Sequence, residues 1–309
     1  MIKVENLKKT YGTMNAVNDI SFEIDRGEIV GFLGPNGAGK TTTMKILTGF
    51  IGSTSGTASI AGHDVETASL DVRRRVGYMP ESSPLYTDMD VLGYLKFIAE
   101  VREIDPGLLS ARLDSVATTC GLKQVLRKPI SQLSKGYKQR VGLAQAIIHD
   151  PEVLILDEPT SGLDPNQIIE IRELIRKLGK EKTVVLSTHI LPEVEAVCSR
   201  AIIINKGNIV AQGSISELTA SAHETVSAKI RGDKSAIEAG LRAIDGIQSA
   251  ICKGGVNGFN NFEIVPVKGH SVAESVFRFA ADKGFSMCEL KTEGASLEDV
   301  FTRLTRSVA

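Results

Sequence analysis

Apolar runs, and regular alternation of apolar with polar residues, divide the first two-thirds of the chain into strands and helices. Continuous apolar runs predict strands covered on both faces of a sheet, and they span residues 29–33, 153–157 and 183–188. Alternation at 2–7 and 20–24 predicts a half-exposed antiparallel pair. Alternation at 201–205 and 209–212, around the turn Lys206-Gly207-Asn208, predicts a closing hairpin.

Helical spacing of apolar residues dominates from Thr87 to about Ile148. A second helical segment, Asn166 to Leu178, lies between two of the predicted buried strands. The pattern therefore predicts an α/β core into which a helical subdomain, at about residues 87–148, is inserted.

The last third of the chain has its own order of elements. Gly213-Ser214 and the polar stretch 219–224 together predict a domain boundary, with one domain at residues 1–219 and another at 220–309. Beyond it the pattern is strand, helix, strand, strand, helix, strand, with a turn at 254–258, which predicts a ferredoxin-like α+β domain. Ser296 and Asp299 predict the cap of a final helix.

Composition indicates an ordinary globular protein of about two domains, with 309 residues, 42% of them apolar and 24% charged. Lys plus Arg is 36 against 37 Asp plus Glu, so no global basic field favours nucleic acid or an anionic membrane. No apolar run approaches the roughly 18–20 residues that span a bilayer, and the N-terminus is unlike a signal peptide. We therefore expect a cytoplasmic protein that does not itself cross a membrane.

The four cysteines show neither C-x-x-C nor Cys/His metal spacing, so we expect packing thiols rather than ligands or disulfides.

A glycine-rich segment between the first buried strand and a predicted helix carries the strongest chemical signal. Gly34-Pro35-Asn36-Gly37-Ala38-Gly39-Lys40-Thr41 fits G-x-x-x-x-G-K-[ST] at every defined position. Glycines let successive backbone N–H groups face phosphate oxygens, and the helix N-terminus adds partial positive charge. The segment predicts a phosphate-binding loop in which Lys40 reaches the β- and γ-phosphates and Thr41 holds Mg²⁺; a plain glycine turn is the alternative.

Polar residues end the other two buried strands. Asp157 ends the run 153–157 and Glu158 follows it; at such a place an Asp can hold a metal ion and a Glu can accept a proton from water. His189 follows the strand 183–188, at the edge of an α/β sheet where ligands collect. Solvated acids and a structural histidine are the alternatives.

Two further segments carry weaker signals. Tyr11, upstream of the glycine loop, is either a stacking face for a base or a packing aromatic. Ser134, two residues before Gly136, predicts on spacing alone only the N-cap of a helix.

Taken in order, these residues resemble the ATP-binding subunit of an ABC transporter over about residues 1–219. The resemblance rests on the following matches: Tyr11 as the adenine-stacking aromatic, Gly34 to Thr41 as Walker A with Thr42 after it, Leu133 to Gln139 as the signature sequence, Val153 to Asp157 as Walker B, Glu158 as the general base, Ser161 to Asp164 as the D-loop, and His189 as the switch histidine. Two departures stand out. Lys135 and Tyr137 alter the signature, and Glu81 replaces the usual Q-loop glutamine, although a carboxylate there can still reach Mg²⁺ or a water.

The resemblance implies a P-loop ATPase of the ABC type: a mixed sheet core, an antiparallel subdomain, an inserted helical subdomain and a C-terminal accessory domain. It implies ATP and Mg²⁺ as ligands, with Thr41, Asp157 and Glu81 at the metal. It also implies two copies, or a pseudo-dimer, meeting head to tail, so that Ser134 and Gly136 of one contact the ATP of the other. Hydrolysis would then drive a separate integral membrane permease, with this chain on the inner face of the cell membrane.

Pro80-Glu81 and the appended C-terminal unit resemble the branch of gliding-motility and multidrug or antibiotic exporter ATPases, so we expect an ABC-2 type exporter. One alternative is a non-transport ABC ATPase acting on nucleic acid, the ribosome or a regulator. The single Walker A loop and the absence of heptads or a cysteine module disfavour it, and we expect no direct nucleic-acid partner. A regulatory binding role for the C-terminal unit stays open.

Overall fold

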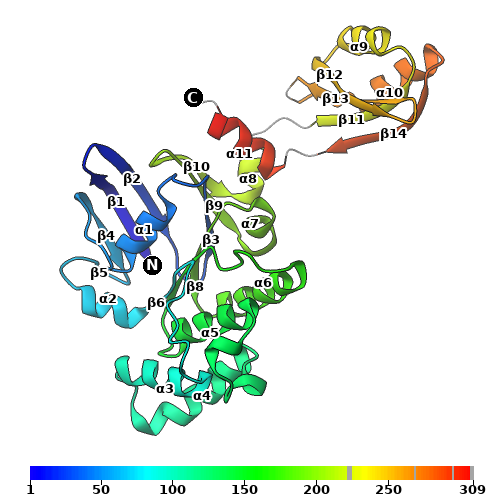
Figure 1. Ribbon diagram of the computed structural model, residues 1–309. Coiled ribbons are helices and arrows are strands. Elements are labelled where there is room, and N and C mark those ends of the chain that lie inside the picture. Colours follow the sequence, from blue (N-terminus) through cyan, green and yellow to red (C-terminus); the bar gives the residue numbers. More distant parts are fainter. Residues whose placement is uncertain (221–224, 268, 294–295, 307–309) are drawn as a thin grey trace. The chain divides into compact units, whose positions relative to one another are not determined.

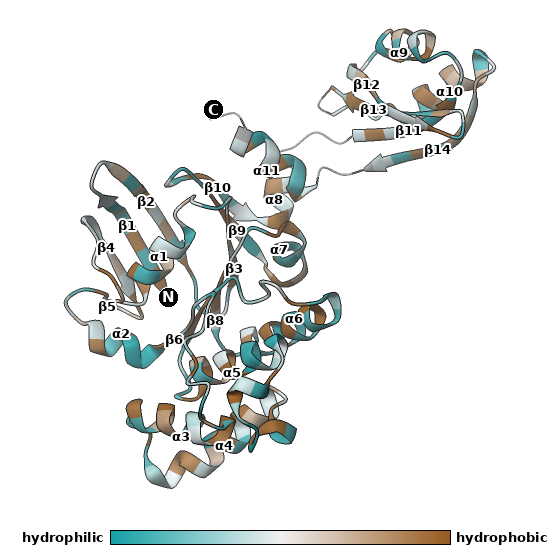
Figure 2. Ribbon diagram, viewed as in Figure 1, coloured by the Kyte–Doolittle hydropathy of each residue, from teal (hydrophilic) through white to brown (hydrophobic). Residues whose placement is uncertain are grey.

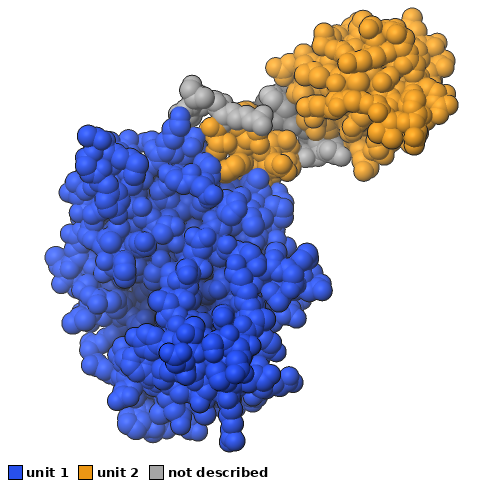
Figure 3. Space-filling view, viewed as in Figure 1, with its two compact units in different colours: residues 1–215 blue, residues 216–309 orange. Residues whose placement is uncertain are grey.

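A computed structural model describes residues 1–220, 225–267, 269–293 and 296–306. The chain divides into two compact units, residues 1–215 and 216–309 (Figure 3). The division lies between Gly213-Ser214 and the polar stretch 219–224, four residues before the predicted end of the first domain. It falls inside helix α8 (Ile215–Ala220), in which Leu218 is buried.

The core of the first unit is a six-stranded mixed sheet with the order β10-β9-β3-β8-β7-β6 (Figure 1). Its strands are β3 (Ile29–Leu33), β6 (Val76–Met79), β7 (Val153–Asp157), β8 (Thr183–Thr188), β9 (Arg200–Asn205) and β10 (Asn208–Ser214). All pairs are parallel except β9 with β10, which form the predicted hairpin. The three apolar runs are confirmed as β3, β7 and β8, and β8 lies between the other two.

A second, antiparallel sheet has the order β2-β1-β4-β5. It consists of β1 (Ile2–Tyr11), β2 (Met14–Ile24), β4 (Ser55–Ile60) and β5 (His63–Asp64). The predicted pair is confirmed, but both strands extend to a tight turn, because Met14 and Tyr11 continue the antiparallel register.

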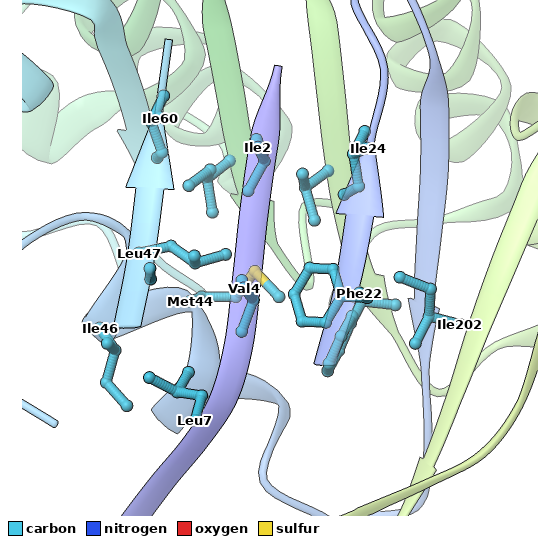
Figure 4. Packing of buried hydrophobic residues seen from close by; sticks show 14 of the residues in the cluster. Ile2, Val4, Leu7, Phe22, Ile24, Met44, Ile46, Leu47, Ile60 and Ile202 are labelled. Atoms are coloured by element: carbon cyan, nitrogen blue, oxygen red, sulfur yellow. The ribbon is translucent and has the colours of Figure 1, made fainter. Parts of the chain in front are cut away.

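The apolar face of this sheet packs on helix α1 (Lys40–Leu47), which starts at the glycine loop. Figure 4 shows Val4 and Phe22 beside Met44 of α1 and Ile202 of β9, all buried. Each large side chain removed from water here contributes about 1.5–3 kcal/mol. This cluster therefore fixes the helix that carries the glycine loop against both sheets.

Helices fill the connections between core strands. Between β6 and β7 lie α3 (Val91–Val101), α4 (Pro106–Thr119) and α5 (Lys135–Ile147), with short 3-10 turns at Lys123–Val125 and Ile130–Gln132. Helix α6 (Pro165–Gly179) joins β7 to β8, and α3 and α6 mix hydrophobic with hydrophilic residues (Figure 2). Helices α2 (Ser69–Arg75) and α7 (Leu191–Val197) also belong to the first unit. Helix α7 was not predicted, because two turns are too short to show a helical period.

Within the described part of the chain, no helix combines the length and apolarity that crossing a membrane requires.

The second unit confirms the ferredoxin-like prediction. Strands β11 (Thr225–Arg231), β12 (Ile247–Val256), β13 (Phe259–Pro266) and β14 (Ser286–Glu293) form an antiparallel sheet of order β12-β13-β11-β14. Helices α9 (Lys234–Arg242) and α10 (Ala273–Asp282) connect them, and Ile237, Leu241 and Val276 join its core. The spacing of Ile237, Leu241 and Ile244 predicts one helix face, but α9 ends at Arg242 and Ile244 lies beyond it.

The turn predicted at residues 254–258 is wrong in extent. Strand β12 continues to Val256 and only Asn257 and Gly258 turn, with φ of 54° and 78°. The pairing register of β12 with β13 shifts between Cys252 and Gly254, and both glycines stay paired in the strand. Glycines often mark such irregularities in strands.

The last helix, α11 (Leu297–Arg306), has the predicted cap. The Asp299 carboxylate accepts from the Ser296 backbone N–H at 3.0 Å, and Ser296 Oγ accepts from the Asp299 N–H at 3.1 Å.

Candidate functional site

The glycine loop has no space for side chains at its two ends. A Cβ on Gly39 would lie 2.4 Å from the Ala16 carbonyl oxygen, and φ there is 109°, which L-residues rarely adopt. A Cβ on Gly34 would lie 2.4 Å from the Ile204 carbonyl oxygen. The loop is therefore held tightly between the hairpin strand β9 and the antiparallel sheet, and only glycine fits at these positions.

The Lys40 amine lies inside the curve of this loop. Its Nζ donates to the Gly34 carbonyl at 2.8 Å and to the Pro35 carbonyl at 3.3 Å, and lies 3.4 Å from Glu158 Oε1. Both side chains are almost fully buried, with 6% of Lys40 and 7% of Glu158 exposed. A cation and a carboxylate from distant parts of the sequence thus share one enclosed space.

Backbone conformation turns Glu158 toward that space. It follows the last residue of β7 with a φ of 49°, while its N–H still donates to the Ser187 carbonyl at 2.9 Å. The His189 Nδ1 lies 3.0 Å from both carboxylate oxygens of Glu158. A left-handed non-glycine residue is uncommon and strained, and here the strain places the carboxylate.

Asp157 is held behind this pair. Its carboxylate is buried and accepts from Ser187 Oγ at 2.6 Å. The Tyr78 hydroxyl on the neighbouring strand β6 is also buried and finds no hydrogen-bond partner among the described residues. Burial first, and the Asp157 charge second, raise the pKa of Tyr78 far above its usual value. Tyr78 therefore stays neutral and adds no negative charge beside Asp157.

A cavity of about 360 Å³ connects these groups. Its lining includes Pro35 to Thr42, with Lys40 among them, and Tyr11, Glu81, Glu158 and His189. Gly34 and Asp157 lie behind this lining, in the loop and the strand that shape it. Three adjacent parallel strands lead to these groups: the glycine loop after β3 ends at Lys40, and His189 and Glu158 directly follow β8 and β7.

Ser134 and Gly136 do not line this cavity. Ser134 caps α5, with its Oγ accepting from the Tyr137 N–H at 3.4 Å, as its spacing alone predicts. A Cβ on Gly136 would lie 2.7 Å from Gln167 of α6, and the Lys135 amine occupies the space beside Gly162. The predicted signature sequence and D-loop are therefore packed against each other, apart from the cavity.

One buried acid near the site, Glu193, was not predicted from the sequence. Glu193 of α7 accepts hydrogen bonds from the hydroxyls of Thr160 and Thr188, which flank Glu158 and His189 in sequence. The available signal was a carboxylate among the apolar residues Ile190, Leu191 and Val194. Short apolar stretches with one acid are common, so this signal is weak without the structure.

Comparisons with known proteins agree with this geometry. The sequence profile of the ABC transporter family matches residues 17–161. The chain is 33% identical over 308 residues to the uncharacterized ABC transporter ATP-binding protein YxlF of Bacillus subtilis (strain 168), covering 99% of this chain and 100% of that protein. It is 38% identical to the lantibiotic transport ATP-binding protein SrtF of Streptococcus pyogenes, covering 68% of this chain and 89% of SrtF.

A solved structure of an ATP-binding subunit of an ABC transporter superposes with a TM-score of 0.65 at 32% identity, covering 71% of this chain and 91% of that one. The chain therefore belongs to the ABC transporter family and is one of its ATP-binding proteins.

Proposed function

We propose that this chain hydrolyses ATP in the cavity between the glycine loop and Glu158, and that the reaction drives an export permease. The observation that carries the proposal is the convergence of three groups. The Lys40 amine lies 3.4 Å from Glu158, and His189 lies 3.0 Å from the same carboxylate. Lys40 and the loop N–H groups bind the phosphates, Glu158 accepts the proton of the attacking water, and His189 contacts the γ-phosphate.

The oxygen donors at the cavity fit Mg²⁺. Thr41 lines the cavity with its hydroxyl-bearing side chain, Asp157 is a buried carboxylate next to Glu158, and Glu81 adds a carboxylate to the lining. Mg²⁺ prefers one or two carboxylates together with substrate phosphates and water, so a dedicated cluster of acids is not needed. When bound, the ion would neutralise phosphate charge. We assign Thr41 and Asp157 to it, with Glu81 reaching it directly or through water.

We propose that two copies pair head to tail. Ser134 and Gly136 lie outside the cavity of their own chain, next to residues 162–167. The capped start of α5 presents free backbone N–H groups, which attract phosphate. Pairing would place these groups on the ATP bound to the other copy.

Tyr11→Ala is expected to weaken ATP binding about fivefold. Tyr11 lines the cavity and is 47% exposed, so stacking on a base contributes at the lower end of the usual range, about 1 kcal/mol. Titration with ATP measures the change. Tyr11→Phe, which keeps the ring face, should bind as the unchanged protein does; equal weakening in both variants would contradict the stacking role.

A separate groove offers a site for the permease. Its volume is about 790 Å³, and Leu70 of α2, Val101 of α3 and Leu108 of α4 expose apolar side chains along it. Arg102 donates to the Arg73 backbone carbonyl at 2.7 Å, and neither guanidinium pairs with a carboxylate among the described residues. Burial first, then the Arg73 charge, lowers the pKa of Arg102. An apolar cytoplasmic segment that carries an acidic residue would complement this groove.

The experiment is affinity purification of the tagged chain from detergent-solubilised membranes of its own host. We expect an integral membrane protein to be recovered with the chain. The double variant Leu70→Glu, Val101→Glu should lose that protein and still hydrolyse ATP. Phe277→Glu, an exposed apolar residue of α10, serves as the matched control and should retain it. Recovery without any membrane protein would instead favour a non-transport ATPase.

Lantibiotic transport by SrtF supports export as the direction. On this proposal the chain lies at the cytoplasmic face of the membrane, held there by its permease. The first compact unit would be the ATP-binding domain and the second an accessory domain.

A further inference from the structure

A second buried carboxylate lies near Glu158, and the hydrolysis proposed above assigns it no role. The Glu193 side chain in α7 is 1% exposed. Its Oε2 accepts from Thr188 Oγ1 at 2.8 Å, and its Oε1 accepts from Thr160 Oγ1. It forms no ion pair among the described residues. Burying a carboxylate is costly unless its oxygens are hydrogen-bonded, so these two hydroxyls are what hold the charge.

The two hydroxyls belong to the two segments that carry the catalytic groups. Thr160 lies two residues after Glu158 and begins the turn that leads into α6, where its carbonyl accepts from the Leu163 N–H at 3.2 Å. Thr188 is the last residue of β8 and immediately precedes His189. Glu193 therefore links the segment after β7 to the segment after β8 through one side chain.

The Thr188 hydroxyl lies between two carboxylates. It is 2.8 Å from Glu193 and 3.5 Å from Glu158, and it accepts from the Ile190 N–H at 3.1 Å. A hydroxyl has only one hydrogen to donate, and the shorter distance assigns that hydrogen to Glu193. The Glu158 oxygens are consequently left to His189 and Lys40, which face the cavity.

We propose that Glu193 is a positioning residue for ATP hydrolysis, which orients the Thr188 hydroxyl away from Glu158 and ties the Thr160 turn to β8. The inference rests on the proposed role of Glu158 as the acceptor of the water proton. The two hydroxyls meet different oxygens of Glu193, and a glutamine at this position replaces one of those oxygens with a donor NH₂ group, so in this arrangement one hydroxyl loses its acceptor. One of them must then turn its hydrogen elsewhere. For Thr188 the nearest alternative acceptor is Glu158.

The test is Glu193→Gln, assayed for steady-state phosphate release and for ATP affinity. We expect kcat to fall about 10-fold while the ATP dissociation constant stays within about twofold, because small displacements of reacting groups cost rate rather than binding. A packing role alone predicts unchanged kcat in this isosteric variant once folding is verified by circular dichroism. Unchanged kcat would overturn the inference.

Two substitutions at Thr160 keep the test decisive if Glu193→Gln does not fold. Thr160→Ser keeps the hydroxyl and loses the methyl group, whereas Thr160→Val keeps the shape and loses the hydroxyl. We expect the serine variant to retain kcat and the valine variant to lose it, and equal loss in both would contradict the proposal. Thr183→Val, at the far end of β8, removes a buried hydroxyl that accepts from the Gly27 N–H, and should leave kcat unchanged.

Turnover of Glu158→Gln and Glu193→Gln, measured together, distinguishes failure of the proposed function from failure of this inference. Wild-type turnover in Glu158→Gln would overturn the proposed catalytic role, and this inference with it. An inactive Glu158→Gln variant combined with a fully active Glu193→Gln variant would overturn this inference alone.

Discussion

Glu158→Gln is expected to bind ATP and to lose nearly all turnover. The amide has the shape of the carboxylate but cannot accept the proton of the attacking water, and general-base groups contribute about 10²- to 10⁴-fold to rate. The Lys40 amine keeps its bonds to the Gly34 and Pro35 carbonyls, so the phosphate loop should stay intact. Steady-state phosphate release measures turnover, and titration with ATP measures binding.

A matched control for this variant is Glu173→Gln, which removes one carboxylate from the exposed face of α6. Its turnover should equal that of the unchanged protein. Near wild-type phosphate release from Glu158→Gln would show that another group accepts the proton.

Lys40→Ala is expected to weaken ATP binding about 10- to 100-fold, because hydrogen bonds to charged groups contribute about 1.5–3 kcal/mol. The Lys40 amine is the cation that lines the cavity beside the loop carbonyls, so phosphate charge loses its nearest counter-charge. Equilibrium titration with ATP provides the measurement, and circular dichroism verifies that the variant folds.

Lys45→Ala is the control for charge. Lys45 lies on the same helix, near the Phe50 ring and outside the cavity lining, so its removal changes net charge equally. Unchanged affinity in Lys40→Ala, or equal weakening in both variants, would count against direct phosphate binding.

The extent of prediction from sequence differed between elements for identifiable reasons. Strands β3, β7 and β8 were predictable because both of their faces are covered, which requires unbroken apolar runs. Helix α7 was not, because it has only two turns and begins with Leu191-Pro192. The glycines at 254 and 255 suggested a turn, but pairing with β13 keeps them in a strand.

The candidate site shows the same division. The spacing of Gly34, Gly39 and Lys40 is set by local sterics, since φ of 109° at Gly39 excludes a side chain, and so the loop could be recognised from sequence. Glu193 could not, because no motif marks its pairing with Thr188, and its other partner Thr160, 33 residues earlier in the sequence, reaches it only through the fold.

The amino-acid sequence by itself determined which segments become buried strands, where the phosphate loop lies and which residue types follow each strand, because these depend on local sterics and on which faces must be apolar. Only the tertiary structure decided that β8 lies between β3 and β7. That order brings Lys40, His189 and Glu158 together, since parallel strands end at the same edge of a sheet. Which strands lie side by side depends on the long crossover connections between them, and local sequence does not set it.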